Sequence, residues 1–539
     1  MKVTDAIIKC LEKEKIDTIF GYPGGAVLPF YESLRNSDIN HILVRNEQSA
    51  AHSASGYARA SGKVGVCIAT SGPGATNLIT GIATAYMDSI PIVILTGQVN
   101  STSIGKDVFQ EADILGATEP FTKHNYLVKN SKDIPKILKE AFHIASTGRP
   151  GPVLIDIPLD IQKQDIKFKY PKDVNIIGYK PTYQGHKGQI KKALSKLKES
   201  KKPLICVGGG IICAKASKEL QNFSQKAKIP VVHTLMGIGA LATNSPYYVG
   251  MVGSHGHNHS NNVVMEADLL MIIGARVADR ATAGFNLIEE KTAIIHIDID
   301  PAEIGKNLST TIPVVGDAKN ILKELIKEIT PLDTDEWIGK INTLKEKKNK
   351  EISCFNNFVN PKNALKLLSK LTSENTIITA DVGQNQIWAA RNFEIKENRK
   401  YLTSGGLGTM GYSLPAAIGA KLASPQKKVI SVIGDGGLQM LLSELGTLSE
   451  NKLNIIILLF NNNRLGMVKE LQDFHYGKNK NYAVKFELNP DFVKIAEAYG
   501  LEAKKISSDK DFEKAIKNSL KNNRGCLLEC IIEPNFNTL

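Results

Sequence analysis

The sequence lacks several features that would assign it to other classes of protein. No stretch of its 539 residues approaches the ~18 consecutive apolar residues of a membrane-spanning helix, so we expect no membrane segment. Its seven cysteines are odd in number and have no framework spacing, which indicates reduced thiols and a cytoplasmic location. Residues 1–20 form an amphipathic pattern interrupted by charges, which is not typical of a secretory signal.

The chain also lacks the pattern of a nucleic-acid-binding protein, although it is basic. Its formal net charge is +13, but the lysines are spread singly along expected helices, with one local cluster at residues 345–350. No basic stripe is interleaved with aromatic residues, which make up 6% of the chain. We therefore expect a solvated lysine-rich surface and no nucleic-acid partner.

The chain is long enough for about three domains, and its pattern divides it in that way. Apolar strand-like runs alternate with helical patterns, and the runs end in glycine or polar residues. This pattern predicts an α/β fold with three doubly wound parallel-sheet domains at residues 1–165, 188–330 and 361–539. A polar linker around residues 171–185 and a helical segment at 331–360 are expected to connect them.

The most informative stretch is a strand–helix–strand pattern in the last third of the chain. An apolar run ends in Gly-Asp-Gly-Gly at residues 434–437, one helical pattern covers 438–448, and a second apolar run at 455–460 ends in three asparagines. Such a unit brings Asp435 and Asn462 to the same carboxyl edge of a parallel sheet. Side-chain oxygens beside glycine N–H groups at a helix start suit a magnesium ion paired with a diphosphate.

This pattern of Gly-Asp-Gly followed by Asn-Asn resembles the signature of thiamine-diphosphate enzymes. A second motif, GLGTMG at residues 406–411, has the GxGxxG spacing of a dinucleotide site. A nicotinamide dehydrogenase is nevertheless the weakest alternative, because the acidic residue that follows lies inside Gly-Asp-Gly-Gly. A dinucleotide site does not require a pair of oxygen ligands for a divalent cation at that edge.

Across nearly its whole length the chain resembles the catalytic subunits of acetohydroxyacid synthases, also called acetolactate synthases. Many motifs in the family's order carry this resemblance: FGYPGGAVLPFY (20–31), TSGPGATN (70–77), GKDVFQEADILG (105–116), TKHNYLV (122–128), GRPGPVLIDIP (148–158), HIDIDPAEIGKN (296–307), DVGQNQIWAA (381–390) and SGGLGTMGY (404–412). The resemblance implies decarboxylation of pyruvate on thiamine diphosphate and addition of the hydroxyethyl unit to a second 2-ketoacid. The product would serve valine, leucine and isoleucine biosynthesis.

The resemblance also implies a set of catalytic residues. Glu47 would activate the cofactor at its pyrimidine ring, a general acid–base contribution of ~10²–10⁴ in rate; taken alone, it is an acidic residue favoured at a helix start. Phe109, Gln110 and Lys123 would line the substrate side. Arg280 would hold the carboxylate of the second ketoacid, because a guanidinium binds carboxylates in a bidentate way.

Further residues are implied for thiamine diphosphate, Mg²⁺ and FAD. The thiamine diphosphate contacts would be Pro23, Gly24, Val382, Gly383, Gln384, Asn385, Gly408, Met410, Asp435, Gly436, Gly437, Asn462 and Met467. Mg²⁺ would be held by Asp435, Asn462 and the carbonyl of Arg464. The FAD contacts would be Arg149, Gly208, Gly209, Gly210, Thr234, Leu235, Met236, Ser254, His255, Gly256, Gly274, Arg276, Arg280, Asp298, Ile299, Asp317 and Ala318.

Two positions and one segment depart from the family's usual pattern. Asn46 stands where the family has histidine, and an amide cannot titrate near neutrality. Leu471 replaces a tryptophan that helps to select 2-ketobutyrate, so we expect pyruvate to be preferred over 2-ketobutyrate as second substrate. Residues 256–264 differ within the expected FAD region. Arg280 has a purely structural alternative to binding the second ketoacid, which is an ion pair with the neighbouring Asp279.

The resemblance implies an assembly as well. In this family the glutamate and the diphosphate halves of the site come from different subunits, so we expect a homodimer or tetramer with shared active sites and a small regulatory subunit. Two alternatives remain beside the synthase. One is another thiamine-diphosphate 2-ketoacid decarboxylase or carboligase, and the other is a non-catalytic homologue.

Overall fold

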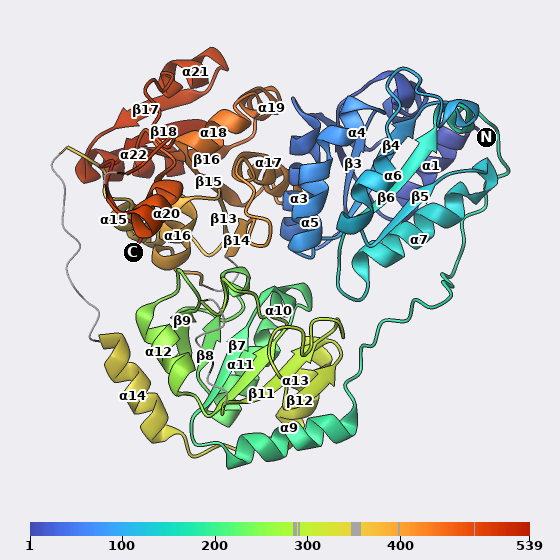
Figure 1. Cartoon of the computed structure of the whole chain (residues 1–539). Helices are drawn as coiled ribbons and strands as arrows, with labels where there is room; N and C mark the ends of the chain where they lie inside the picture. The colour runs from blue at the N-terminus through green and yellow to red at the C-terminus, as the bar shows by residue number, and fades with distance from the viewer. Residues whose placement is uncertain (284–287, 289–290, 347–356, 397–398, 479) are drawn as a thin grey trace.

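The protein contains three parallel six-stranded sheets flanked by helices, which confirms the predicted α/β class (Figure 1). This computed structural model describes residues 1–539 except 284–287, 289–290, 347–356, 397–398 and 479. Much of the predicted lysine cluster therefore lies outside the described residues. Among the helices described, none is both long and apolar enough to cross a membrane. None of the cysteines described forms a disulfide.

The first sheet has the strand order β2-β1-β3-β4-β6-β5. Its strands are β1 (Thr18–Gly21), β2 (Asn40–Leu43), β3 (Gly65–Ala69), β4 (Ile92–Gln98), β5 (His124–Leu127) and β6 (Val153–Pro158). Its helices are α1 (Val3–Lys13), α2 (Leu28–Arg35), α3 (Glu47–Ser61), α4 (Pro73–Asn77), α5 (Ile79–Met87), α6 (Ile114–Thr118), α7 (Ile134–Ser146) and α8 (Leu159–Gln162). The buried central strands are rich in Val, Ile and Leu, as expected for a parallel sheet covered on both faces.

The middle sheet has the order β12-β11-β10-β7-β8-β9, the 3-2-1-4-5-6 arrangement of dinucleotide-binding folds. Its strands are β7 (Pro203–Val207), β8 (Val231–His233), β9 (Tyr248–Met251), β10 (Leu269–Ile273), β11 (Ala293–Asp298) and β12 (Ile312–Val315). Its helices are α9 (Lys187–Glu199), α10 (Gly209–Cys213), α11 (Ser217–Ala227), α12 (Asn258–Glu266), α13 (Ala318–Glu328) and α14 (Asp335–Glu346).

The third sheet, β14-β13-β15-β16-β18-β17, repeats the strand order of the first. Its strands are β13 (Thr376–Ala380), β14 (Lys400–Thr403), β15 (Lys428–Gly434), β16 (Ile455–Asn461), β17 (Glu502–Ile506) and β18 (Cys526–Ile531). Its helices are α15 (Pro361–Leu371), α16 (Gln384–Asn392), α17 (Ser413–Ala423), α18 (Asp435–Met440), α19 (Glu444–Glu450), α20 (Gly466–Tyr476), α21 (Phe492–Ala498) and α22 (Asp509–Lys521).

One predicted element differs from the structure. The single helix expected over residues 438–448 is two helices, α18 and α19, because Leu441 leaves the helical conformation at φ −133° and ψ 40°. The leucine spacing alone did not reveal this break, since Leu438, Leu441, Leu445 and Leu448 are all buried in spite of it.

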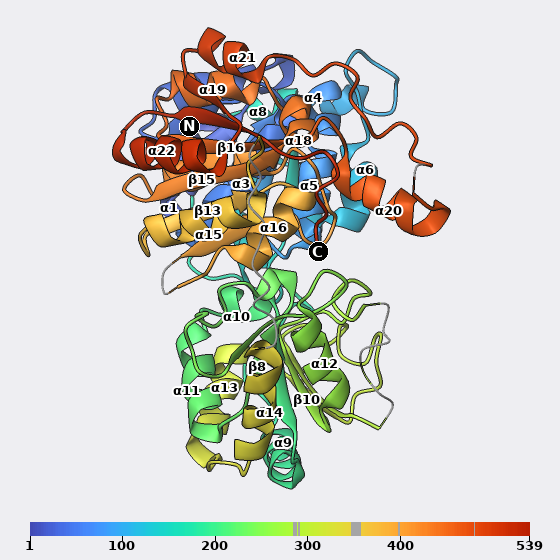
Figure 2. The same ribbon diagram turned by 90° about the vertical axis from the view of Figure 1, so that its left-hand side faces the viewer.

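Helices α3 and α17 join the first and third domains, which lie side by side above the middle domain (Figures 1 and 2). Their backbones approach closely at two glycines. A Cβ at Gly419 would overlap the carbonyl oxygen of Ser53, and one at Gly56 would overlap that of Ala416. The hydroxyl of Ser53 donates to the carbonyl of Pro415 at 3.0 Å, so the contact is polar as well as tightly packed.

Replacing Gly419 with alanine tests this helix contact. The added carbon has no room against a backbone oxygen, so Gly419→Ala should lower the free energy of unfolding by ~1–3 kcal/mol, the usual cost of overpacking. The measurement is urea denaturation followed by circular dichroism. Gly339→Ala in α14 is the matched control, because nothing lies within 4 Å of its Cβ position. That change should stabilise the protein by ~0.5–1 kcal/mol, as alanine does in an exposed helix. Equal effects of the two changes would contradict the interpretation.

Candidate active site and cofactor sites

The carboxyl edge of the third sheet presents two adjacent helix starts. Helices α16 and α18 follow β13 and β15, which are parallel neighbours with Ala380 opposite Val432. Gly383 precedes α16 at φ +138°, a conformation that favours glycine, and it turns the chain so that the first N–H groups of α16 face this edge. Free N–H groups at a helix start attract anions.

Oxygen side chains gather beside these helix starts. Asp435 is the first residue of α18, and Asn462 directly follows β16, whose residue Phe460 lies opposite Gly434. The amide of Asn489 donates to Asp435 at 2.8 Å. Burial raises the pKa of Asp435 to about 6, and the Asn489 hydrogen bond partly opposes this shift. A carboxylate, an amide oxygen and a backbone carbonyl form the hard-oxygen set that Mg²⁺ prefers, so these residues fit the ion.

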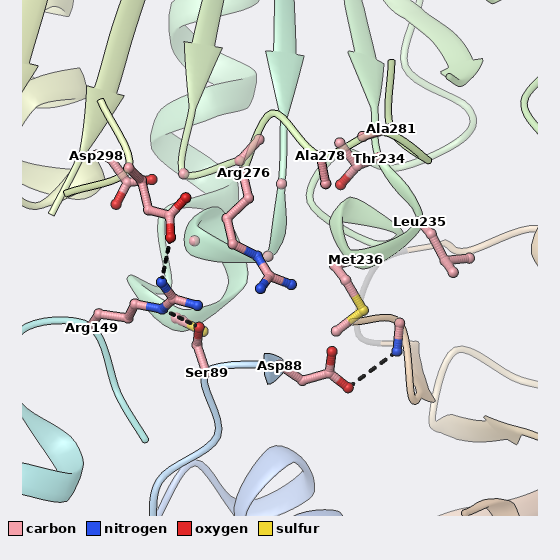
Figure 3. A pocket seen from close by; sticks show the side chains of 18 of the residues that line it. Asp88, Ser89, Arg149, Thr234, Leu235, Met236, Arg276, Ala278, Ala281 and Asp298 are labelled. Atoms are coloured by element: carbon pink, nitrogen blue, oxygen red, sulfur yellow. Dashed lines mark hydrogen bonds and ion pairs between the residues drawn. The ribbon is translucent and has the colours of Figure 1, made fainter. Parts of the chain in front are cut away.

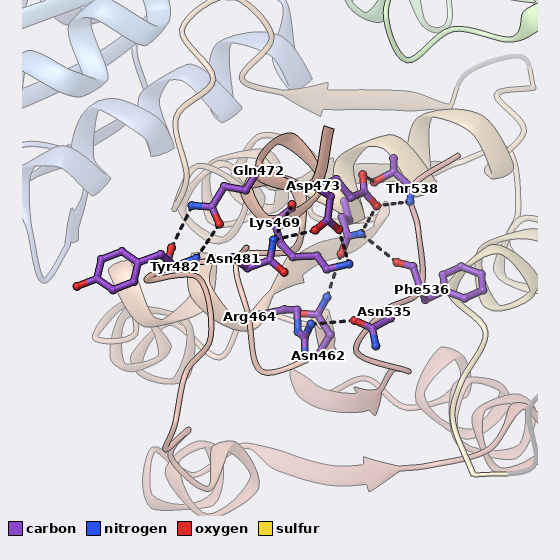
Figure 4. A network of polar contacts seen from close by, with 12 residues as sticks. Asn462, Arg464, Lys469, Gln472, Asp473, Asn481, Tyr482, Asn535, Phe536 and Thr538 are labelled. Carbon is purple, nitrogen blue, oxygen red and sulfur yellow. Dashed lines mark hydrogen bonds and ion pairs between the residues drawn. The ribbon is translucent and has the colours of Figure 1, made fainter. Parts of the chain in front are cut away.

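Around this edge, α20 and residues 535–538 form a polar network (Figure 4). The amide nitrogen of Gln384 donates to Glu470 at 2.7 Å and to the carbonyl of Phe536 at 3.0 Å. Arg464, the residue whose carbonyl was predicted as a metal ligand, donates from its guanidinium to Asn535 at 3.0 Å. The Gln384 side chain therefore faces α20, and only its backbone N–H is left for the predicted diphosphate contact. Among the described residues, no three His, Cys, Asp or Glu side chains gather into a metal site.

Glu47 starts helix α3 on the first domain. The side chain of Asn46 caps this helix by accepting from the N–H of Gln48 at 2.8 Å, which gives asparagine a physical role at this position. The carboxylate of Glu47 accepts from the amide of Asn77 at 2.9 Å and lies beside Gly74 of the SGPG motif. Among the contacts of the described residues, Glu47 and Asp435 share no polar partner.

The residues predicted for the substrate side occupy different environments. Phe109 is 87% exposed, and Gln110 adopts φ +59° with its backbone against Gly72. Lys123 donates to the carbonyls of Ile144 and Thr147 at the end of α7 and to the hydroxyl of Tyr179. Burial lowers the pKa of Lys123 to about 8. Lys123 thus caps a helix C-terminus, and its predicted contact with substrate gains no support from the structure.

A cavity of about 310 Å³ lies where the three domains meet (Figure 3). It opens at the carboxyl ends of β7 and β10, the central neighbours of the middle sheet, where the direction of strand order reverses and ligands bind in such folds. Every predicted FAD residue except Ser254 lines it: Arg149, Gly208, Gly209, Gly210, Thr234, Leu235, Met236, His255, Gly256, Gly274, Arg276, Arg280, Asp298, Ile299, Asp317 and Ala318.

Several charged side chains line the cavity. Arg276 extends into its centre, where burial lowers the pKa of the guanidinium (Figure 3). Arg149 is held by Glu303 at 2.7 Å and by Asp300 at 3.2 Å, and burial raises the pKa of Asp298 nearby to about 6. Guanidinium groups beside close glycine backbones suit an anionic ligand group. The side chain of Arg280, by contrast, is 68% exposed, and its Nε lies 3.8 Å from a carboxylate oxygen of Asp279. This ion pair is the structural alternative to a binding role that was considered from the sequence.

Asp88, which lines the cavity from the first domain, was not found by sequence reasoning. Its buried carboxylate accepts from the N–H groups of Gly406 at 2.7 Å and Gly405 at 3.2 Å. These glycines begin the loop that carries Gly408 and Met410. Asp88 follows the end of α5 without a recognisable motif, and only the fold brings it to residues more than 300 positions away.

Comparison with known proteins defines the class. Models of thiamine pyrophosphate enzymes match the chain with their N-terminal TPP binding domain at residues 1–117, central domain at 190–325 and C-terminal TPP binding domain at 381–530. A probable acetolactate synthase large subunit from Methanocaldococcus jannaschii is 48% identical, over 99% of this chain and 92% of the relative. Acetolactate synthase isozyme 3 large subunit from Escherichia coli is 41% identical, over 98% and 94%. The chain therefore belongs to the acetolactate synthase large-subunit family.

The Asp88 contact generates a prediction. In Asp88→Asn, one of the two acceptor oxygens becomes an NH₂ group. This donor would face the backbone N–H of Gly405 or Gly406, which would lose its acceptor. We expect a loss of ~1–3 kcal/mol in the free energy of unfolding, the cost of an unsatisfied buried polar group, measured by urea denaturation. Asp165→Asn is the control, because that carboxylate is 78% exposed and its ion pair contributes at most ~1 kcal/mol. An Asp88→Asn variant as stable as Asp165→Asn would refute the role of Asp88 in holding the loop at Gly405 and Gly406.

Proposed function

We propose that this protein is the catalytic large subunit of an acetolactate synthase. It decarboxylates pyruvate and adds the two-carbon unit to a second 2-ketoacid, for the synthesis of valine, leucine and isoleucine. The observation that carries the proposal is the similarity to acetolactate synthase large subunits along nearly the whole chain. The paired Asp435 and Asn462 at one sheet edge fit the same chemistry.

Thiamine diphosphate, when bound, supplies the carbanion chemistry that removes CO₂ from a 2-ketoacid. Its diphosphate would be held by backbone N–H groups at the starts of α16 and α18, and Mg²⁺ would be held by Asp435, Asn462 and the carbonyl of Arg464. Glu47 holds a proton at the pyrimidine ring. Gly408 and Met410 stand on the loop that packs beside α18, where the Met410 methyl group lies 3.4 Å from the Cβ position of Gly436.

FAD is the proposed ligand of the cavity between the three domains. The cavity falls within the ~300–1,000 Å³ of small-molecule sites, and its glycine-lined strand ends and two arginines fit a dinucleotide. Because the proposed reaction has no net redox change, the flavin has no electrons to transfer in it. Arg276 and Gly405, on the loop held by Asp88, line the cavity from the middle and third domains, so a bound flavin would instead help to fix the three domains.

The assembly is proposed to be a homodimer, or a tetramer built from it, with a small regulatory subunit. Glu47 and Asp435 belong to different halves of a site, and large apolar side chains remain exposed around both halves: Phe109 (87%), Phe474 (82%) and Leu488 (89%). A second copy of the chain would cover them and complete the site.

Glu47→Gln tests the reaction and its activating carboxylate. With pyruvate, thiamine diphosphate, Mg²⁺ and FAD, the wild type should form acetolactate, and the variant should lose ~10²–10⁴ in rate because glutamine cannot exchange the proton. Acetolactate is measured by its acid-catalysed conversion to acetoin. Glu32→Gln, an exposed glutamate paired with Arg35, should keep the wild-type rate.

The same variant tests the shared site. Co-expression of Glu47→Gln with Asp435→Ala should restore part of the activity that each lacks alone, since a hybrid dimer contains one intact site. Failure to recover any activity from confirmed hybrids would contradict the shared site. Acetaldehyde in place of acetolactate from the wild type would indicate a simple decarboxylase.

Leu471 is proposed to set the preference for the second ketoacid. In a competition between equal pyruvate and 2-ketobutyrate, acetolactate should predominate, and Leu471→Trp should shift the product ratio toward 2-aceto-2-hydroxybutyrate on the order of tenfold. Tyr476→Trp, an exposed side chain at the end of the same helix, is the control and should leave the ratio unchanged. Strong selection of 2-ketobutyrate by the wild type would overturn this assignment.

A further inference from the structure

The carboxylate of Glu470, on α20, accepts hydrogen bonds from Gln384 and Thr538 in the polar network beside the proposed metal-binding edge. One oxygen accepts from the amide of Gln384 at 2.7 Å and from the backbone N–H of Thr538 at 2.6 Å. The other accepts from the hydroxyl of Thr538 at 2.7 Å. All three donors point at this single side chain, so Glu470 acts here as an acceptor only.

This fixes the orientation of the Gln384 amide. A carboxylate facing a backbone N–H can only accept, so Gln384 must present its NH₂ group to Glu470. The second N–H of that group donates to the carbonyl of Phe536 at 3.0 Å. Both donors of Gln384 are therefore in use, and its oxygen points the other way, toward Asn462.

The orientation of Asn462 follows in turn. The oxygen of Gln384 lies 2.9 Å from the amide nitrogen of Asn462, which must be a donor because the Gln384 oxygen only accepts. The oxygen of Asn462 is consequently left for the cation. Gly466 makes this arrangement possible, since a Cβ there would overlap the Gln384 oxygen and lie 2.9 Å from the Asn462 nitrogen.

We propose that Glu470 is a positioning residue for the magnesium site, acting through Gln384 to hold the Asn462 amide with its oxygen toward the ion. Glu470 itself touches neither the ion nor the cofactor. The proposal rests on the proposed function, because that function assigns Mg²⁺ to Asn462. Residues that orient metal ligands through hydrogen bonds typically contribute 10–100-fold in affinity.

The same carboxylate links the proposed metal site, through Gln384, to Thr538 near the end of the chain. Helix α20 has no buried residue, so its position depends on contacts such as those of Glu470 with Gln384 and Thr538. If bound Mg²⁺ holds Asn462 and Gln384 in this arrangement, it strengthens the contact of Thr538 with Glu470, and by reciprocity that contact strengthens Mg²⁺ binding by the same factor.

The test measures Mg²⁺ binding by calorimetry, with thiamine diphosphate saturating and no pyruvate present. Glu470→Ala should raise the dissociation constant of Mg²⁺ by ~10–100-fold. Glu470→Gln, which keeps one acceptor oxygen, should give a smaller loss. Asp473→Asn is the matched control: it removes a carboxylate from the next turn of α20, where Asp473 pairs with Lys469, and should leave Mg²⁺ binding within about twofold of the wild type.

Two further readouts separate positioning from a general structural role. Activity of Glu470→Ala should recover at high Mg²⁺, so the loss appears in the Mg²⁺ requirement and not in kcat. In a Gln384→Met background, Glu470→Ala should cause little further loss of affinity, because the relay is already broken. Amide exchange at Thr538 should slow when Mg²⁺ binds the wild type and remain unchanged in Gln384→Met.

Several outcomes would overturn the proposal. Unchanged Mg²⁺ affinity in Glu470→Ala, an equal loss in Asp473→Asn, or additive losses in the double variant would each do so. These failures are distinct from failure of the proposed function, in which the wild-type protein itself would show no Mg²⁺-dependent binding of thiamine diphosphate.

Discussion

The contact between α3 and α17 is the constraint on which the rest of the structure depends. Helix α3 begins at Glu47, and α17 begins after the loop that carries Gly408 and Met410. The buried carboxylate of Asp381 holds that loop by accepting from the N–H groups of Gly411 and Ser413. One glycine-mediated helix crossing thereby fixes Glu47 of the first domain relative to the loop with Gly408 and Met410 of the third; in the proposed dimer these two parts serve different sites, and the cavity forms beneath them.

Much of the fold follows from apolar runs that end in glycine, proline or polar residues. Strands β1, β3, β4, β6, β7, β8, β10, β11, β15 and β16 could be located in this way. Strands β5 and β12 could not, because both are short edge strands: β5 is partly polar and partly exposed, and β12 carries an exposed proline, Pro313. The break at Leu441 was also beyond the pattern, since it changes the backbone without changing which side chains are buried.

The parts of the candidate site that lie in recognisable sequence motifs could be predicted from the sequence. The Asp435–Asn462 spacing predicted the proposed diphosphate and metal edge, and the resemblance supplied sixteen of the residues that line the cavity. Side-chain direction was not predictable. Gln384 turns toward α20 and Lys123 toward the end of α7, because each satisfies carbonyl or carboxylate acceptors that only tertiary folding brings near. Asp88 lacked any local signal.

The two tryptophans of the chain lie in different domains, and both are buried. Trp337 donates from α14 to the carbonyl of Pro203 in the middle domain, at 3.2 Å. Trp388 lies on α16 in the third domain, packed against Phe460 and Phe536. Replacement of either one by phenylalanine leaves a single intrinsic fluorophore, so the unfolding of the flavin-side domain and that of the diphosphate-side domain become separately visible in one unlabelled protein.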